Sequence, residues 1–128
     1  MFRNRTSAWV VLGAVIVFVS GGPALAGPPR HSSRVTFSAP VALPGVTIGG
    51  GSYIFELAAP YTRSDIVTVT NGTRSIVYYT GFTQVIERPR GGSDTIRLSE
   101  AAPGSVPLIL EWFPNGDTSG HRFLYKGR

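Results

Sequence analysis

Histidine is the only side-chain type in this cysteine-free sequence that titrates near neutral pH without a large shift in pKa, and the chain has two, His31 and His121. His31 falls in a stretch rich in proline and serine, which we expect to be too flexible to hold a catalytic base. His121 opens the last expected strand, where Asp117 or Glu111 could join it. We expect His121 to be a partly exposed residue at a strand end, bonded to a loop carbonyl.

Glutamate pairs would indicate a glycosidase, and Glu56, Glu87 and Glu111 all lie on or near expected strands. Nothing in their spacing brings two of them together, and strand glutamates usually face water. The sequence also lacks the Gly-x-Ser-x-Gly motif of a serine nucleophile. We therefore predict no catalytic residues and no enzyme activity. A small secreted carbohydrate-active hydrolase that uses His121 with a carboxylate remains the alternative.

The absence of cysteine excludes thiolate nucleophiles, zinc–cysteine sites, iron–sulfur clusters and covalently attached haem. The glycines at 49–51 are not a phosphate-binding loop, because the Gly-Lys-Ser/Thr ending is missing. Segment 115–119 is rich in oxygen ligands but lacks the acidic residues of a calcium loop. The sequence thus predicts no metal site and no cofactor.

Aromatic side chains offer the best candidates for a binding surface. In a strand, the adjacent Tyr78 and Tyr79 must point to opposite faces, so one ring is expected outside. Phe113 would also be exposed if Trp112 faces inward. Together with His121, these three aromatic residues form the predicted surface-binding set, and packing within the core is the competing interpretation.

The N-terminus has the three-part pattern of a secretory signal peptide. Arg3 and Arg5 precede an apolar run over 8–19, and Ala24-Leu25-Ala26 forms a cleavage site before Gly27. The run is shorter than the ~20 residues that cross a bilayer. We predict a signal peptide over 1–26, cleaved after Ala26, and a secreted or periplasmic product without a transmembrane span. An uncleaved N-terminal anchor is the alternative.

The rest of the chain reads as a flexible leader over 27–33 and one β domain over 34–128. Its apolar residues come in short alternating runs, and no helical periodicity is sustained. We expect an all-β antiparallel sandwich of two sheets, with about 7–8 short strands. The alternation over 108–113 places Leu108, Leu110 and Trp112 inward. Asn71-Gly72 predicts a hairpin with a type I′ turn between strands 65–70 and 73–82.

The charge distribution argues against a nucleic-acid partner. Loss of Arg3 and Arg5 with the signal peptide would reduce the formal net charge from +5 to +3. The remaining basic residues are spread along the chain beside turns, whereas a nucleic-acid site needs a basic stripe with stacking aromatics. The expected partner is a protein or a polysaccharide of the cell envelope.

Four segments resemble those of a group of small secreted bacterial β-sandwich proteins. They are a Leu-Pro-Gly turn at 43–45, a Gly-x-Tyr strand at 51–57, Asp-Ile-Val at 65–67, and a closing Gly-His-x-Phe-x-Tyr strand at 120–125. The group has no assigned activity, so the resemblance implies export and the fold but no site residue. The sequence therefore predicts an exported, non-catalytic envelope protein with a binding or structural role, or a subunit of an envelope assembly.

Overall fold

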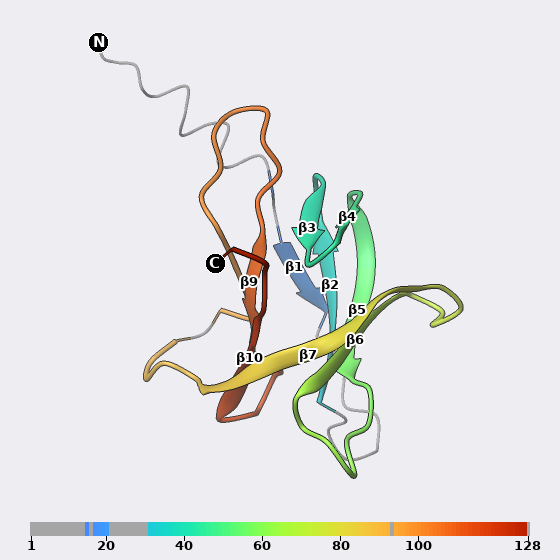
Figure 1. Ribbon diagram of the computed structural model, residues 1–128, viewed down its shortest axis with the longest axis vertical. Helices are drawn as coiled ribbons and strands as arrows, with labels where there is room; N and C mark the ends of the chain where they lie inside the picture. Colours follow the sequence, from blue (N-terminus) through green and yellow to red (C-terminus); the bar gives the residue numbers. More distant parts are fainter. Residues whose placement is uncertain (1–14, 16, 21–30, 93, 128) are drawn as a thin grey trace.

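The computed structural model describes residues 15, 17–20, 31–92 and 94–127, and every regular element among them is a β-strand (Figure 1). The prediction of an all-β protein is confirmed. The strands are β1 (Val17–Ser20), β2 (Ser32–Phe37), β3 (Val41–Leu43), β4 (Val46–Ile48), β5 (Gly51–Leu57), β6 (Ile66–Asn71), β7 (Val77–Glu87), β8 (Ile96–Leu98), β9 (Ile109–Trp112) and β10 (Ser119–Phe123).

Strand β7 joins the two halves of the molecule. Eight strands form one sheet in the order β1-β2-β5-β6-β7-β10-β9-β8, and β3 and β4 form a separate hairpin. The first part of β7, as far as Phe82, pairs with β6, and the part from Thr83 onward pairs with β10. Figure 1 shows β7 running across the molecule between these halves. Two separate sheets are therefore not confirmed, because one long strand belongs to both layers.

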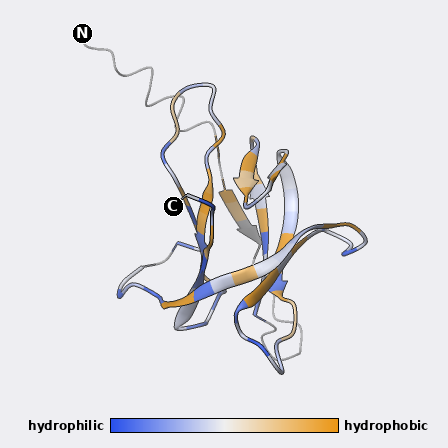
Figure 2. Ribbon diagram, viewed as in Figure 1, coloured by the Kyte–Doolittle hydropathy of each residue, from blue (hydrophilic) through white to orange (hydrophobic). Residues whose placement is uncertain are grey.

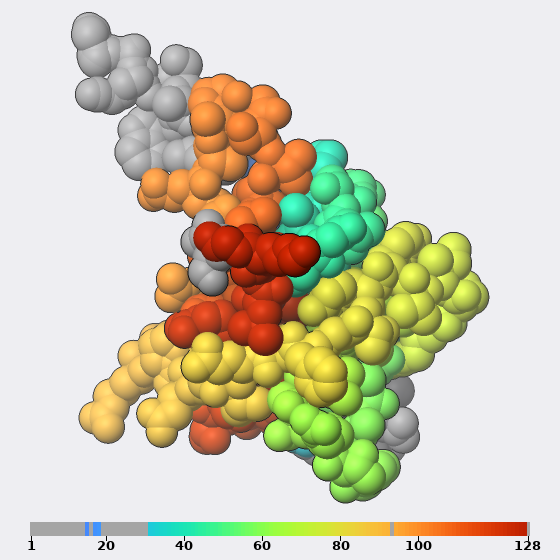
Figure 3. All heavy atoms as spheres, viewed as in Figure 1, coloured from blue at the N-terminus to red at the C-terminus, as the bar shows by residue number. Residues whose placement is uncertain are grey.

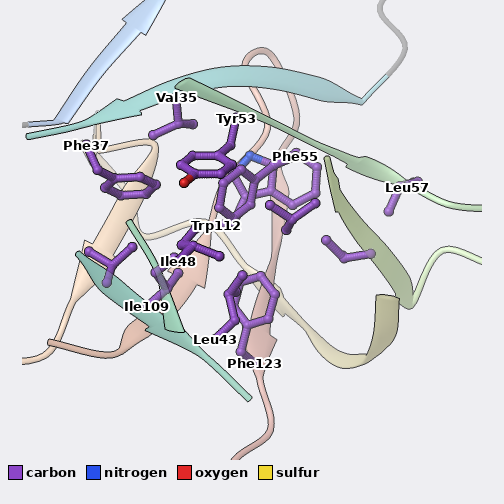
Figure 4. Close-up of a cluster of buried hydrophobic side chains, with 13 residues drawn as sticks. Val35, Phe37, Leu43, Ile48, Tyr53, Phe55, Leu57, Ile109, Trp112 and Phe123 are labelled. Carbon is purple, nitrogen blue, oxygen red and sulfur yellow. The ribbon is translucent and has the colours of Figure 1, made fainter. Parts of the chain in front are cut away.

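The two halves of the sheet face each other across an aromatic core. The ring centroid of Phe55 on β5 lies 6.0 Å from that of Trp112 on β9 and 6.4 Å from that of Phe123 on β10 (Figure 4). All three side chains are buried. Since the chain has no cysteine and therefore no disulfide, this apolar packing and the backbone ladders must supply the stability.

A β-bulge in the β6–β7 pair changes the side to which one tyrosine points. Val69 pairs with Tyr79 but the next residue, Thr70, pairs with Val77, so Tyr78 is an extra residue in β7. An extra residue breaks the alternation of side chains. As a result, both tyrosines pack against the core, whereas strict alternation predicted one inside and one outside.

A second bulge lies in β9. The register with β8 skips Leu110, which stands between the paired residues Ile109 and Glu111. Ile109 and Trp112 consequently both enter the core, although they are three positions apart. The inward position of Trp112 is confirmed. The expectation that Leu110 shares its face is wrong, because the bulge shifts the alternation between them.

The predicted hairpin of β6 and β7 is confirmed, but its turn is longer than expected. Arg74 is the residue in the left-handed region, with φ of 60°, and neither Asn71 nor Gly72 has a positive φ. The side-chain Oδ1 of Asn71 accepts hydrogen bonds from the backbone N–H groups of Ser75 and Ile76. The type I′ prediction is wrong because this side chain stabilises a wider loop.

Most of the predicted signal peptide lies outside the described residues, except for Val15 and Val17–Ser20. The latter form β1, which pairs antiparallel with β2 at one edge of the sheet. Of the predicted flexible leader, residues 27–30 also lie outside, while Ser32 and Ser33 already belong to β2. Among the described residues, no helix is long and apolar enough to cross a bilayer.

Candidate functional site

His31 contacts a residue far along the chain. Its Nδ1 lies 2.6 Å from Oδ2 of Asp117, in the turn that precedes β10. The contact ties the start of β2 to the start of β10. No local motif could reveal this pair, since 86 positions separate its members.

His121 is buried, with 3% of its surface exposed, and not partly exposed as its position at a strand end suggested. Its ring stacks on Trp112, with centroids 5.2 Å apart. Its Nδ1 lies 3.2 Å from Oγ1 of Thr83, and that hydroxyl donates to the carbonyl of Asp65. Because a threonine hydroxyl has a single proton, His121 must donate to Thr83 through Nδ1–H.

The surroundings of His121 favour its neutral form. Burial is the main cause that lowers the pKa of His121, and nearby His31 lowers it further. The carboxylates of Asp117 and Asp65 act in the opposite direction but do not outweigh the loss of hydration. The neutral imidazole thus serves as a packed, hydrogen-bonded part of the core.

Acidification is expected to destabilise the protein through His121. Since its pKa is lower in the folded state, its contribution to stability is fully present above the unfolded-state pKa of about 6.5 and is lost as pH falls below that value. The measurement is the melting temperature between pH 7.5 and 5. The His121→Asn variant should show a flatter profile over this range, and an unchanged profile would contradict the assignment.

The side chains suited to hydrolysis do not form an open site. His31, Asp117 and His121 line none of the three cavities described below. Glu56 pairs with Arg74 on one half of the sheet, and Glu111 pairs with arginines on the other. Glu87 is exposed. Within the described part of the chain, no three His, Asp or Glu residues are placed to hold a metal ion.

The four aromatic and histidine residues predicted to bind at the surface do not gather in one exposed patch. Tyr78 and Tyr79 are half-buried, and their rings lie against Tyr53 and Phe123 respectively. Phe113 and His121 are buried. The ring of Phe113 lies over the backbone of Gly120 and under the guanidinium of Arg88, whose Cζ is 5.3 Å from its centroid. The glycine at position 120, which leaves room for the ring of Phe113, was the feature of the sequence that could have indicated that Phe113 is buried.

A different set of side chains is exposed on the outer face of β7 and β10. Arg122 pairs with Gln84, and their side chains line a cavity of about 410 Å³ together with Glu111 and Leu124. Phe82, two residues before Gln84 on β7, has 57% of its surface exposed. We call Phe82, Gln84, Arg122 and Leu124 the β7–β10 face. β7 and β10 lie on the side of the molecule turned to the reader in Figure 3.

Arginines surround this face. Glu111, itself buried, lies 3.0 Å from Nη2 of Arg122 and 3.4 Å from Nε of Arg97, so one carboxylate balances two half-exposed guanidinium groups. Next to β7, Cζ of Arg63 lies 5.4 Å from the centroid of Phe82. Arg97 also lines a cavity of about 200 Å³ with Arg88 and Asp94. The neighbourhood therefore combines an exposed aromatic side chain, with one guanidinium over its ring, and an excess of cationic donors.

Phe82 was not among the residues predicted from the sequence, and it follows Gly81, a residue type that often marks a bend in a strand. A Cβ at position 81 would fall on the ring of Tyr79, so the glycine makes room for that inward ring and β7 continues without interruption. The exposed aromatic residue of this part of β7 is therefore Phe82, which follows Gly81. In Figure 2 the ribbon of β7 carries both hydrophobic and hydrophilic residues, as expected of a strand with two different faces.

Comparisons with protein-family models, with curated proteins and with solved structures gave no significant match, so function must be argued from the geometry of the chain itself.

Proposed function

We propose that this chain is an exported, non-catalytic protein of the cell envelope that binds an anionic polysaccharide through the β7–β10 face. The observation that carries the proposal is the exposed side chain of Phe82, whose ring has Arg63 over it and which is followed along β7 by the cavity at Gln84 and Arg122. In this proposal the two halves of the sheet act as the layers of a sandwich. Because β7 pairs with strands of both layers, its outer face carries the binding surface.

The chemistry of the face suits a sugar ring. An aromatic ring stacks on the apolar side of a pyranose, and hydrogen-bonding groups around it reach the hydroxyl groups. Beside Phe82, the hydroxyls of Thr68 and Thr80 lie 2.8 Å apart. On the other side, Gln84 provides an amide within the cavity. An apolar ring between two polar borders is a common form of a glycan-binding surface.

The charges favour an anionic glycan. Arg97 and Arg122 share a single carboxylate, so one positive charge of the pair is not balanced locally. Asp65 accepts two hydrogen bonds from Arg63, which lower the pKa of Asp65 and hold the guanidinium over the ring of Phe82. Positive potential over the face attracts a polymer that carries carboxylates or phosphates.

Export is supported by the basic start, apolar middle and Ala-Leu-Ala site of residues 1–26. The hydrolase alternative has less support, because the contact between a histidine side chain and a carboxylate that the described residues form, His31–Asp117, does not line a described cavity. The assembly alternative requires an open strand edge, and β1 covers the edge of β2 in this structure.

Truncation of Phe82 should weaken glycan binding. In cosedimentation with purified peptidoglycan sacculi, which carry carboxylates, we expect Phe82→Ala to raise the dissociation constant about tenfold, or about 1.4 kcal/mol. Val77→Ala is the matched control, since Val77 is an equally exposed apolar residue of β7 (61%) near the hairpin. It should bind as the parent protein does. Equal binding by Phe82→Ala, or equal retention on neutral cellulose, would refute the proposal.

A further inference from the structure

The N-terminal strand completes the edge of the sheet. Strand β1 pairs antiparallel with β2 over four residues, from Val17 opposite Phe37 to Ser20 opposite Arg34. The side chains of Val15 and Val17 pack against the core, whereas Phe18 points outward and is 60% exposed. With β1 in place, Val35 and Phe37 are fully buried. The strand thus contributes both a backbone ladder and part of the apolar core.

A mostly apolar cavity continues from this edge. It has a volume of about 520 Å³ and is lined by Val15, by Pro40 and by the segment from Leu98 to Pro107, including Val106. Leu98 ends β8, the strand at the opposite edge of the sheet. The cavity therefore lies where the two edges of the nearly closed sheet approach each other.

We propose that, once the signal peptide has been removed, the edge of β2 and this cavity accept an extended apolar strand from a partner polypeptide. The inference rests on the proposed export and cleavage after Ala26. Cleavage removes Val15 and Val17, which leaves the outer N–H and C=O groups of β2 unpaired and the side chains of Val35 and Phe37 less covered. An open strand edge pairs readily with another extended chain.

The geometry defines the partner strand. It must run antiparallel to β2 and place small apolar side chains, the size of valine, at the two alternate positions that Val15 and Val17 occupy. The position after Val17 faces outward, as the exposure of Phe18 shows, and it tolerates many residues. A sugar or a small molecule could not supply the alternating N–H and C=O groups that the edge requires. The occupant is therefore a peptide segment.

The test uses two substitutions to detach β1 from the edge of β2. A synthetic peptide that contains the sequence of β1 is then added to occupy that edge again. In the full chain, V15D/V17D places charges against the core and should release β1, which lowers the melting temperature. A synthetic peptide with the sequence of residues 14–22 should then raise the melting temperature by about 5 °C or more at about ten times its dissociation constant. The parent chain, whose edge is occupied, should show no shift.

The matched control is a peptide that carries the same two aspartates. It should leave the melting temperature of the V15D/V17D chain unchanged. If the V15D/V17D chain does not fold, the milder V15A/V17A variant is used instead. Its melting temperature should decrease less, and the parent peptide should raise it again. No rescue by the parent peptide, or equal rescue by the aspartate peptide, would overturn the proposal. A dimer of the variant in light scattering would also overturn it, because a second copy would then cover the edge. None of these readouts depends on polysaccharide binding, so a failure of strand binding and a failure of glycan binding can be told apart.

Discussion

Replacement of Trp112 by alanine is expected to lower the free energy of unfolding by about 3–5 kcal/mol. Trp112 is fully buried, contacts the ring of Phe55 across the two layers and stacks on His121. Its indole Nε1 also donates to Oγ of Ser33, at 3.0 Å. Truncation would leave a cavity between the layers and an unpaired hydroxyl in the core, and it would remove the contact that fixes His121.

Chemical denaturation monitored by circular dichroism would measure this loss. Tyr61→Ala is the matched control, because Tyr61 is a large aromatic residue that is 98% exposed. We expect this control to change stability by no more than about 0.5 kcal/mol. A loss below about 1 kcal/mol for Trp112→Ala would show that the two layers do not pack around this side chain.

Substitution of Gly120 by alanine should have the second largest effect, a destabilisation of about 3 kcal/mol. A Cβ at this position would fall on the ring of Phe113 and within 2.9 Å of the backbone oxygen of Trp112. The ring cannot move away freely, because it is buried and lies against Arg88. The expected result is a displaced Phe113 and a weakened β9–β10 pair.

Gly49→Ala provides the control for the Gly120 variant. A Cβ at Gly49 would have no neighbour within 4 Å, and its φ is not in the left-handed region. The thermal unfolding midpoint of this control should stay close to that of the parent. Equal midpoints for both variants would contradict the close packing of Phe113 over the strand.

The all-β class and most strand positions could be predicted from the sequence, because short alternating runs separated by glycine, proline and asparagine leave few other choices. The number of layers was harder to predict. Whether β7 ends near Gly81 or continues to Glu87 decides between two sheets and one. That choice depends on the space that Gly81 leaves for the ring of Tyr79, which is a tertiary contact.

The candidate site was predicted less well for a related reason. Strict alternation assigns one of Tyr78 and Tyr79 to the surface, but the bulge opposite Val69 and Thr70 turns both toward the core. The exposed ring belongs instead to Phe82. A bulge arises from the fit between two strands, so the sequence of one strand does not reveal it.

The His31–Asp117 pair shows a similar limit. Composition alone suggested a flexible segment around His31, because prolines and serines have little to bury. The partner that orders it lies in the turn before β10, and only the paired sheet brings the two together. Such contacts over long sequence distances depend on topology, which local patterns do not determine.

Removal of the N-terminal segment is the assumption on which both the envelope role and the open edge of β2 depend. The most direct test is the intact mass of the protein recovered from a fractionated bacterial host that expresses the full chain. We predict a periplasmic or secreted product that begins at Gly27. A cytosolic product that still begins at Met1 would contradict this account.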